Sequence, residues 1–179
     1  PSPPPMQPHH HLPRAAAHRV GQGVAVQLGV EGVLGLVEEH TLLIPGHNDS
    51  SAEIAELARW VVKELGPEVP LHFTAFFPAF KMLDRPPTPP QTLVRARAIA
   101  REEGLAYVYT GNVRDREGAT TYCPDCGTPL IERDGYLITR YALTPEGHCP
   151  ACGREIEGRF AAAPGHFGNR RIPIVLGAG

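Results

Sequence analysis

Two short cysteine motifs of the same form constrain this sequence more than any other feature. All four cysteines lie in them, in the pentapeptides Cys-Pro-Asp-Cys-Gly at 123–127 and Cys-Pro-Ala-Cys-Gly at 149–153. Each Cys-x-x-Cys pair can place two thiolates on one ion, and the glycine that follows allows the positive φ of a tight turn. The 22 residues from 127 to 148 leave room for a hairpin. The pattern therefore predicts one tetrahedral metal site with the ligands Cys123, Cys126, Cys149 and Cys152.

The predicted site is structural rather than catalytic, because four protein ligands leave no open position for a substrate. Zinc is the usual occupant of a ribbon in which two cysteine pairs flank a hairpin, and iron in a rubredoxin-like centre uses the same thiolates. Two disulfides are the alternative to a metal. The sequence shows no charged start followed by an apolar segment, so we expect a cytoplasmic protein, in which a metal is favoured over disulfides.

The charge balance gives no indication of a nucleic-acid partner. The 17 Lys and Arg residues against 19 Asp and Glu residues give a formal net charge of -2, so there is no basic excess to neutralise phosphates. A run of about 18 apolar residues, which a membrane span needs, is absent from the sequence. We therefore expect no nucleic acid and no membrane as partners.

The middle of the sequence alternates strand and helix patterns. Apolar runs at 40–44, 71–77 and 105–110 predict three strands, and the first suits a strand that is buried on both faces. Ser50 and Glu53 form a capping box that begins one helix, which ends at Gly66. Thr88 as N-cap begins a second helix, which ends at Gly104. Helical crossovers of this length connect parallel strands, so the predicted fold class is α/β.

Ligands of parallel sheets bind at the carboxyl ends of the strands, and polar residues follow all three predicted strands. The candidates for cofactor binding are Asn48, Asp49, Lys81 and Asn112. Asn48 and Asp49 have an alternative role, since such residues also satisfy the free backbone groups of turns and helix starts. Lys81 is equally compatible with an ordinary exposed charge.

The cysteine motifs flank a predicted hairpin. Asp134 and Gly135 form a two-residue turn signal between the runs 130–133 and 136–139. The segment 119–160 has 42 residues, close to the limit of about 40 below which a chain usually needs a metal or disulfides to fold. We therefore divide the chain into a disordered or poorly defined Pro/His/Gly-rich segment at 1–36, an α/β segment at 37–118, a zinc ribbon at 119–160 and a tail at 161–179.

Five segments together resemble a known family. They are Thr-Leu-Leu-Ile-Pro-Gly-His-Asn-Asp-Ser at 41–50, Leu-His-Phe-Thr-Ala-Phe-Phe-Pro at 71–78, Lys-Met-Leu-Asp-Arg-Pro-Pro-Thr-Pro at 81–89, Tyr-Val-Tyr-Thr-Gly-Asn-Val at 107–113 and the cysteine motif at 123–127. In this order they resemble the carboxyl-terminal portion of the radical S-adenosylmethionine (radical SAM) enzymes of the AmmeMemoRadiSam system, which are related to the pyruvate formate-lyase activating enzymes. The resemblance implies an incomplete (βα) barrel segment with parallel strands, followed by a small zinc-ribbon-like β unit that holds the four cysteines.

The resemblance also implies cofactors and an activity. Enzymes of this family hold a [4Fe-4S] cluster on a CxxxCxxC loop and bind S-adenosylmethionine, which they cleave reductively to form a radical. This sequence contains no CxxxCxxC loop, because all four cysteines lie in the ribbon motifs. In addition, Phe77 stands where the family more often has a histidine close to the cofactor.

Two functions from different classes follow. The first is the carboxyl-terminal part of a radical SAM enzyme that is inactive alone, with the missing amino-terminal half of the barrel or a protein substrate as its partner. The alternative is a non-catalytic zinc-ribbon binding module on an α/β base. The sequence leaves open whether the chain itself is an enzyme.

Overall fold

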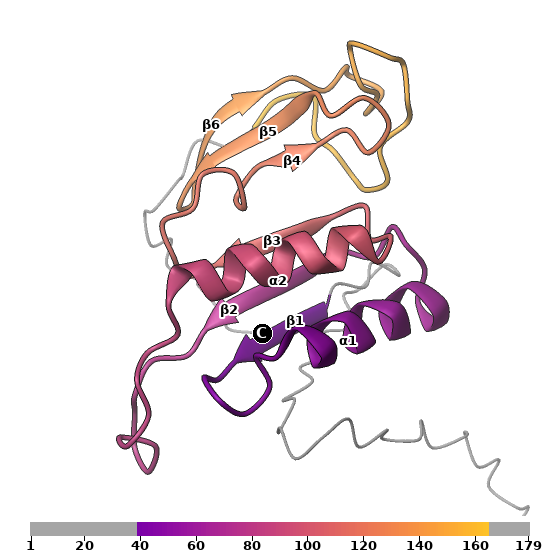
Figure 1. The fold of residues 1–179 in the computed structure, drawn as a ribbon. Helices are drawn as coiled ribbons and strands as arrows, with labels where there is room; N and C mark the ends of the chain where they lie inside the picture. Colours follow the sequence, from indigo (N-terminus) through magenta and orange to yellow (C-terminus); the bar gives the residue numbers. More distant parts are fainter. Residues whose placement is uncertain (1–38, 165–179) are drawn as a thin grey trace, which may run out of the picture.

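The computed structural model describes residues 39–164 of the protein. The predicted disordered segment at 1–36 and the part of the predicted tail beyond residue 164 lie outside the described residues. Figure 1 shows two small sheets, one of which has two helices packed on it.

Strands and helices alternate in the first part of the described chain. It consists of β1 (Glu39–Leu43), α1 (Ser51–Glu64), β2 (Leu71–Ala75), α2 (Pro90–Glu102) and β3 (Val108–Gly111). The strands form one sheet in the order β1-β2-β3, and both neighbouring pairs are parallel. The predicted α/β alternation with parallel strands is therefore confirmed. Both helices lie on the same face of this sheet (Figure 1).

The core of this unit lies between the sheet and its helices. Alternate residues of β2, namely Leu71, Phe73 and Ala75, are buried, as the period of two in a strand requires. They pack against the apolar stripes of α1 and α2, which consist of Ile54, Ala58, Val61, Leu93, Ala96 and Ala100. These helix residues recur at steps of three or four, so each helix presents one apolar face to the sheet.

The opposite face of the sheet carries a ladder of rings. His40, His72 and Tyr109 lie opposite one another in the strand register. The ring centroids of His40 and His72 are 4.6 Å apart, and those of His72 and Tyr109 are 4.8 Å apart. Within residues 39–164 both helices cover the other face, and Leu42 on this face is only half-buried. The expectation that the first strand is buried on both faces is therefore wrong for this part of the chain.

The two helices begin in different ways. Ser50 is confirmed as the N-cap of α1, because the Glu53 backbone N–H donates to Ser50 Oγ. The Glu53 carboxylate also reaches back, but it accepts the Ser50 hydroxyl rather than the Ser50 backbone N–H of a standard capping box. The N-cap of α2 is Pro89 rather than the predicted Thr88. The buried Thr88 hydroxyl instead donates to Leu43 O at 2.6 Å and accepts the Phe76 N–H at 3.0 Å. The Thr88 hydroxyl therefore bonds backbone groups at the carboxyl ends of β1 and β2, and it does not cap the helix.

The second sheet is antiparallel, with the order β4-β5-β6, and consists of β4 (Thr121–Tyr122), β5 (Pro129–Asp134) and β6 (Leu137–Tyr141). Asp134 pairs with Leu137, so the turn of the hairpin is Gly135-Tyr136 rather than the predicted Asp134-Gly135. Gly135 has φ 57°, and a positive φ at the first central position is what the tight turns of hairpins require. The register shift between Glu132 and Arg133, rather than the turn, changes which side chains of β6 lie on the same face as their partners in β5.

The second sheet and its loops pack along the β3 side of the first sheet (Figure 1). Its small core consists of Tyr107, Cys123, Leu130, Ile131, Cys149 and Ile156. Tyr107 precedes β3, and its hydroxyl donates to the Glu157 carboxylate at 2.7 Å, which joins the two units. Within residues 39–164, neither helix is long and apolar enough to cross a membrane.

Candidate metal centre

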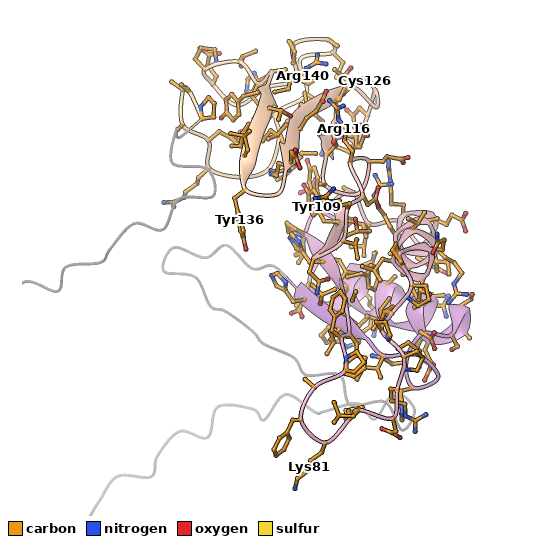
Figure 2. All side chains as sticks on the ribbon, turned by 90° about the vertical axis from the view of Figure 1, so that its left-hand side faces the viewer. Lys81, Tyr109, Arg116, Cys126, Tyr136 and Arg140 are labelled. Carbon is orange, nitrogen blue, oxygen red and sulfur yellow. The ribbon has the colours of Figure 1, made fainter. Side chains whose placement is uncertain are left out.

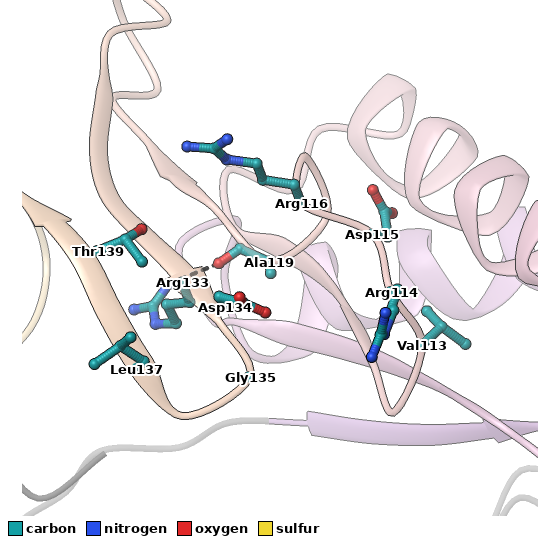
Figure 3. A pocket seen from close by; sticks show the side chains of 10 residues that line it. All are labelled: Val113, Arg114, Asp115, Arg116, Ala119, Arg133, Asp134, Gly135, Leu137 and Thr139. Atoms are coloured by element: carbon teal, nitrogen blue, oxygen red, sulfur yellow. Dashed lines mark hydrogen bonds between the residues drawn. The ribbon is translucent and has the colours of Figure 1, made fainter. Parts of the chain in front are cut away.

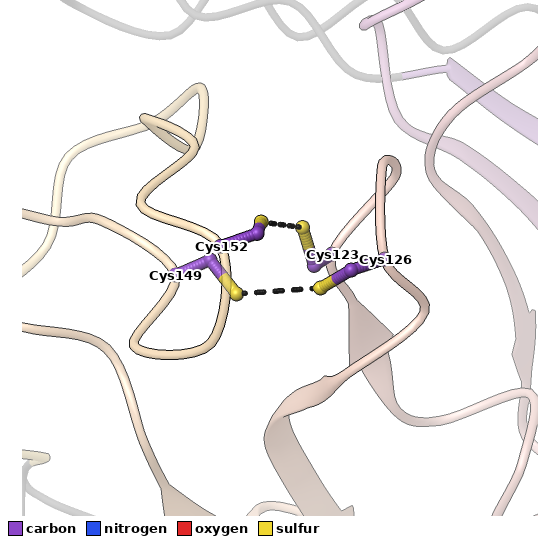
Figure 4. Close-up of side chains that lie close together, drawn as sticks. All are labelled: Cys123, Cys126, Cys149 and Cys152. Atoms are coloured by element: carbon purple, nitrogen blue, oxygen red, sulfur yellow. Dashed lines mark hydrogen bonds between the residues drawn. The ribbon is translucent and has the colours of Figure 1, made fainter.

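The four cysteines meet at one point in the second unit (Figure 4). Their Sγ atoms all lie within 4.8 Å of one another, and the pairs Cys123–Cys152 and Cys126–Cys149 are 3.6 Å apart. Tetrahedral zinc with Zn–S bonds of about 2.3 Å separates its sulfurs by about 3.8 Å. A disulfide has an S–S bond of about 2.05 Å, and all four cysteines are free. The predicted metal site therefore has the right geometry, and the disulfide alternative does not.

The two cysteine motifs fold in the same way. In the first, the Gly127 N–H donates to Cys123 O at 2.9 Å, and in the second the Gly153 N–H donates to Cys149 O at 2.9 Å. These two glycines have φ values of 71° and 78°, which favour glycine over other residues. Each turn thus directs both of its thiols to the same side, as the sequence pattern predicts.

The environments of the thiols differ. Thr128 Oγ1 lies 3.1 Å from Cys126 Sγ, and this contact lowers the pKa of Cys126 to about 6. Burial raises the pKa of Cys123, whose side chain is inside the second core. A bound divalent cation would offset the cost of that burial, because it stabilises thiolates directly. The donor set of four thiols fits zinc or iron.

The metal centre lies beside the amino-terminal ends of the parallel strands. Arg154, directly after the second cysteine motif, donates to Glu68 in the connection that leads into β2, at 2.9 Å. It also donates to Asp125 at 3.0 Å and to Glu157 at 2.9 Å. Because ligands of parallel sheets bind at the opposite, carboxyl ends, the position of the centre agrees with a structural role.

The asparagine and aspartate candidates at the carboxyl ends of the strands close their own loops. Asn48 accepts the Ile44 N–H and donates to Leu42 O, and Asp49 accepts the Gly46 N–H at 2.8 Å. Asn112 has φ 52° and bonds both the N–H and the carbonyl of Ala75. Each of these side chains therefore has a structural task, which was the alternative for Asn48 and Asp49. Their assignment to cofactor binding stays a prediction.

Lys81 lies on the long loop between β2 and α2, and its side chain points outward from this loop (Figure 2). Its ammonium group is 5.3 Å from the ring centroid of Phe80, which is 85% exposed. Phe77 at the start of this loop is 55% exposed, so it does not belong to the core of the sheet. Among the described residues, no hydrogen bond or ion pair joins Lys81 to Asn48, Asp49 or Asn112.

Sequence reasoning missed two features at the carboxyl ends of the strands. The buried Nε2 atom of His47, in the loop after β1, has no hydrogen-bond partner among the described residues. A pocket of about 770 Å³ lies between the β3–β4 loop and the hairpin of β5 and β6. The arginines at 114, 116 and 133 that line it are spread along the sequence, so only their closeness in the fold reveals the pocket.

A [4Fe-4S] cluster does not fit the residues of this chain. Such a cluster needs three or four thiolates of its own. All four cysteines of the sequence already converge on one closed site beside the amino ends of the strands. The chain therefore supplies no ligands for a cluster at the carboxyl ends.

Comparison with known proteins assigns no activity to the chain. It is similar to an uncharacterized protein of Methanocaldococcus jannaschii, with 46% identity over 122 residues. The aligned region is 68% of this chain but 37% of the relative, so the chain spans little more than a third of that protein's length. No family model matches the sequence, and no solved structure matches it.

Proposed function

We propose that this chain is the carboxyl-terminal part of a radical SAM enzyme, that its four-cysteine centre is a structural zinc site, and that the part is inactive alone. The sequence motifs described above suggest the family. One structural observation supports the proposal: both helices lie on one face of a parallel sheet, as in a segment of a (βα) barrel (Figure 1). In such a barrel the helices form the outer ring, and the other face of the sheet lines the interior.

The edges of the sheet support an extension beyond β1. At the outer edge of β3, the Thr110 N–H donates to Gly118 O at 3.1 Å, so the β3–β4 loop covers this edge. Among the described residues no strand pairs with the outer edge of β1. Edge strands that offer unpaired backbone groups are the places where a further strand adds. The amino-terminal half of a barrel would add its strands there.

The cysteines support the proposal that this chain is inactive alone. Because the ribbon uses every thiol of the chain, the ligands of a [4Fe-4S] cluster would belong to the segment that supplies the missing strands. The chain alone should therefore neither hold the cluster nor cleave S-adenosylmethionine. The ribbon metal would instead stabilise the carboxyl-terminal end of the larger enzyme.

The longer archaeal relative offers a test. The relative is purified, reconstituted with iron and sulfide without oxygen, and assayed for 5′-deoxyadenosine released from S-adenosylmethionine with dithionite. A chimera in which this chain replaces the aligned 122 residues of the relative is assayed in parallel. We expect the relative and the chimera to release 5′-deoxyadenosine, and this chain alone to release none.

The outcomes separate the two candidate functions. If the reconstituted relative holds no cluster and releases no 5′-deoxyadenosine, the radical SAM proposal is wrong. A folded, zinc-loaded chain would then favour the non-catalytic binding module, for which the hairpin offers the exposed side chain of Leu137. An active relative with an inactive but folded chimera would show that this chain does not complete the barrel.

A further inference from the structure

The pocket of about 770 Å³ lies where parallel sheets bind ligands (Figure 3). One wall is the loop that follows the carboxyl end of β3, and the other wall is the hairpin of β5 and β6. Its lining residues are Val113, Arg114, Asp115, Arg116, Ala119, Arg133, Asp134, Gly135, Leu137 and Thr139. The volume is in the range of about 300 to 1,000 Å³ that small-molecule sites occupy.

Three arginines line the pocket, and they differ in their partners. Arg133 is fixed, because its Nη1 donates to Ala119 O and to Thr121 Oγ1, each at 3.0 Å. Arg116 donates to Glu132 at 2.8 Å. Arg114 is exposed and makes no ion pair within residues 39–164. Its guanidinium is therefore the group that a ligand can engage without breaking an existing contact.

The two acidic residues of the pocket are not equivalent. Asp115 is used inside the loop, because its carboxylate accepts the Thr110 hydroxyl at 2.9 Å and the Gly118 N–H at 3.0 Å. These bonds satisfy part of the hydrogen-bonding capacity of the carboxylate within the loop. Asp134 at the hairpin tip is exposed and is the group that would oppose an anion in the pocket.

We propose that this pocket binds a small molecule that carries a phosphate or carboxylate group. Arginine presents a planar set of donors that matches both anions. Two arginines line the pocket from different walls: Arg114 comes from the loop, and Arg133 comes from the hairpin and reaches Ala119 O of the loop. Val113, Ala119 and Leu137 supply apolar surface for the rest of the ligand. The pocket shares no lining residue with the metal centre.

The test follows backbone amide shifts of the 15N-labelled, zinc-loaded chain. Inorganic phosphate and succinate are titrated separately, and chloride at matched ionic strength removes general salt effects. We expect saturable shifts in the loop 112–119 and the hairpin 133–139. Saturation by phosphate alone identifies a phosphorylated ligand, and saturation by succinate identifies a carboxylate ligand.

Three variants test whether the probes bind in this pocket. Arg114→Gln should weaken the probe about fivefold, and Asp134→Asn should strengthen it about twofold because the opposing charge is gone. Arg159→Gln, a change of the same kind at an exposed arginine outside the pocket, should leave the affinity unchanged. The proposal is overturned if neither probe saturates, or if Arg114→Gln and Arg159→Gln weaken binding equally.

Discussion

Substitution of one buried metal ligand should unfold the ribbon and spare the α/β unit. Cys149 is 1% exposed and contributes one of the four thiolates. In Cys149→Ser a hydroxyl replaces the thiolate, and a neutral hydroxyl is a poor ligand for zinc. The variant should therefore lose stoichiometric zinc, while Ala151→Ser, in the same turn but not a ligand, should keep it.

The magnitude follows from the small second core. Apart from its two cysteines this core contains Tyr107, Leu130, Ile131 and Ile156. At about 1.5 to 3 kcal/mol for each buried side chain, they contribute about 6 to 12 kcal/mol to folding. A structural zinc site contributes about 10 to 16 kcal/mol at neutral pH. Loss of the metal thus removes about half or more of the favourable free energy, and the ribbon should not stay folded.

Hydrogen exchange with mass spectrometry measures the unfolding of the ribbon, and elemental analysis measures the loss of zinc. In Cys149→Ser, amides of β5 and β6 should exchange at least about 100-fold faster than in the unchanged protein. Amides of α1 and α2 should keep their protection, because their core contains no metal ligand. Unchanged exchange in β5 and β6 with zinc absent would refute the reasoning, since apolar packing alone would then hold the ribbon.

The remaining predictions concern contacts between elements. Thr88→Val should lower the free energy of unfolding by about 1 kcal/mol in urea denaturation, because Leu43 O and the Phe76 N–H lose their bonds to the hydroxyl and keep only the 3.3 Å bond between them. Thr88→Ser should restore most of it. Asn112→Ala should cost about 1 to 3 kcal/mol in the same assay, since Ala75 loses both bonds and alanine disfavours the positive φ. Arg154→Gln removes three ion pairs and should make amides of β5 and β6 exchange faster without releasing zinc. Arg59→Gln removes one exposed ion pair and should leave the exchange of these amides unchanged.

Local signals were the part of the fold that the sequence could predict. The N-cap contact of Ser50 and Glu53 works within one turn of chain, and the cysteine turns close within five residues. Thr88 shows the limit of this reasoning. Its residue type and position suit an N-cap, but its hydroxyl bonds Leu43 O, 45 residues away, because the two strand ends bring these atoms together.

The hairpin turn shows where a local sequence signal leaves the strand register open. Asp134-Gly135 and Gly135-Tyr136 both place glycine in a two-residue turn, and the strand pairing decides between them. The register shift between Glu132 and Arg133 is part of that pairing. Sequence patterns do not contain it, because it depends on how β5 lies between its two neighbours.

The candidate sites also have a part that the sequence predicts and a part that it does not. The spacing of the cysteines was enough to predict which four residues meet, since each pair is fixed by its own turn. The place of the centre was not predictable, because it follows from contacts between distant parts of the chain, such as those of Tyr107 with Glu157 and of Arg154 with Glu68, 86 residues away. The pocket was missed for the same reason: Arg114 and Arg133 become neighbours only when the hairpin lies against the loop after β3.

Strand β5 connects the metal centre with the pocket. It begins at Pro129, three residues after Cys126, and it ends at Asp134 on the pocket wall. Near the pocket end of β5, Arg133 donates a hydrogen bond to Ala119 O in the β3–β4 loop, and the Glu132 carboxylate accepts one from Arg116 in the same loop. A metal that orders one end of this strand therefore also orders the wall at the other end. Because linkage is reciprocal, an anion that binds only the ordered pocket must in turn stabilise the metal-bound ribbon.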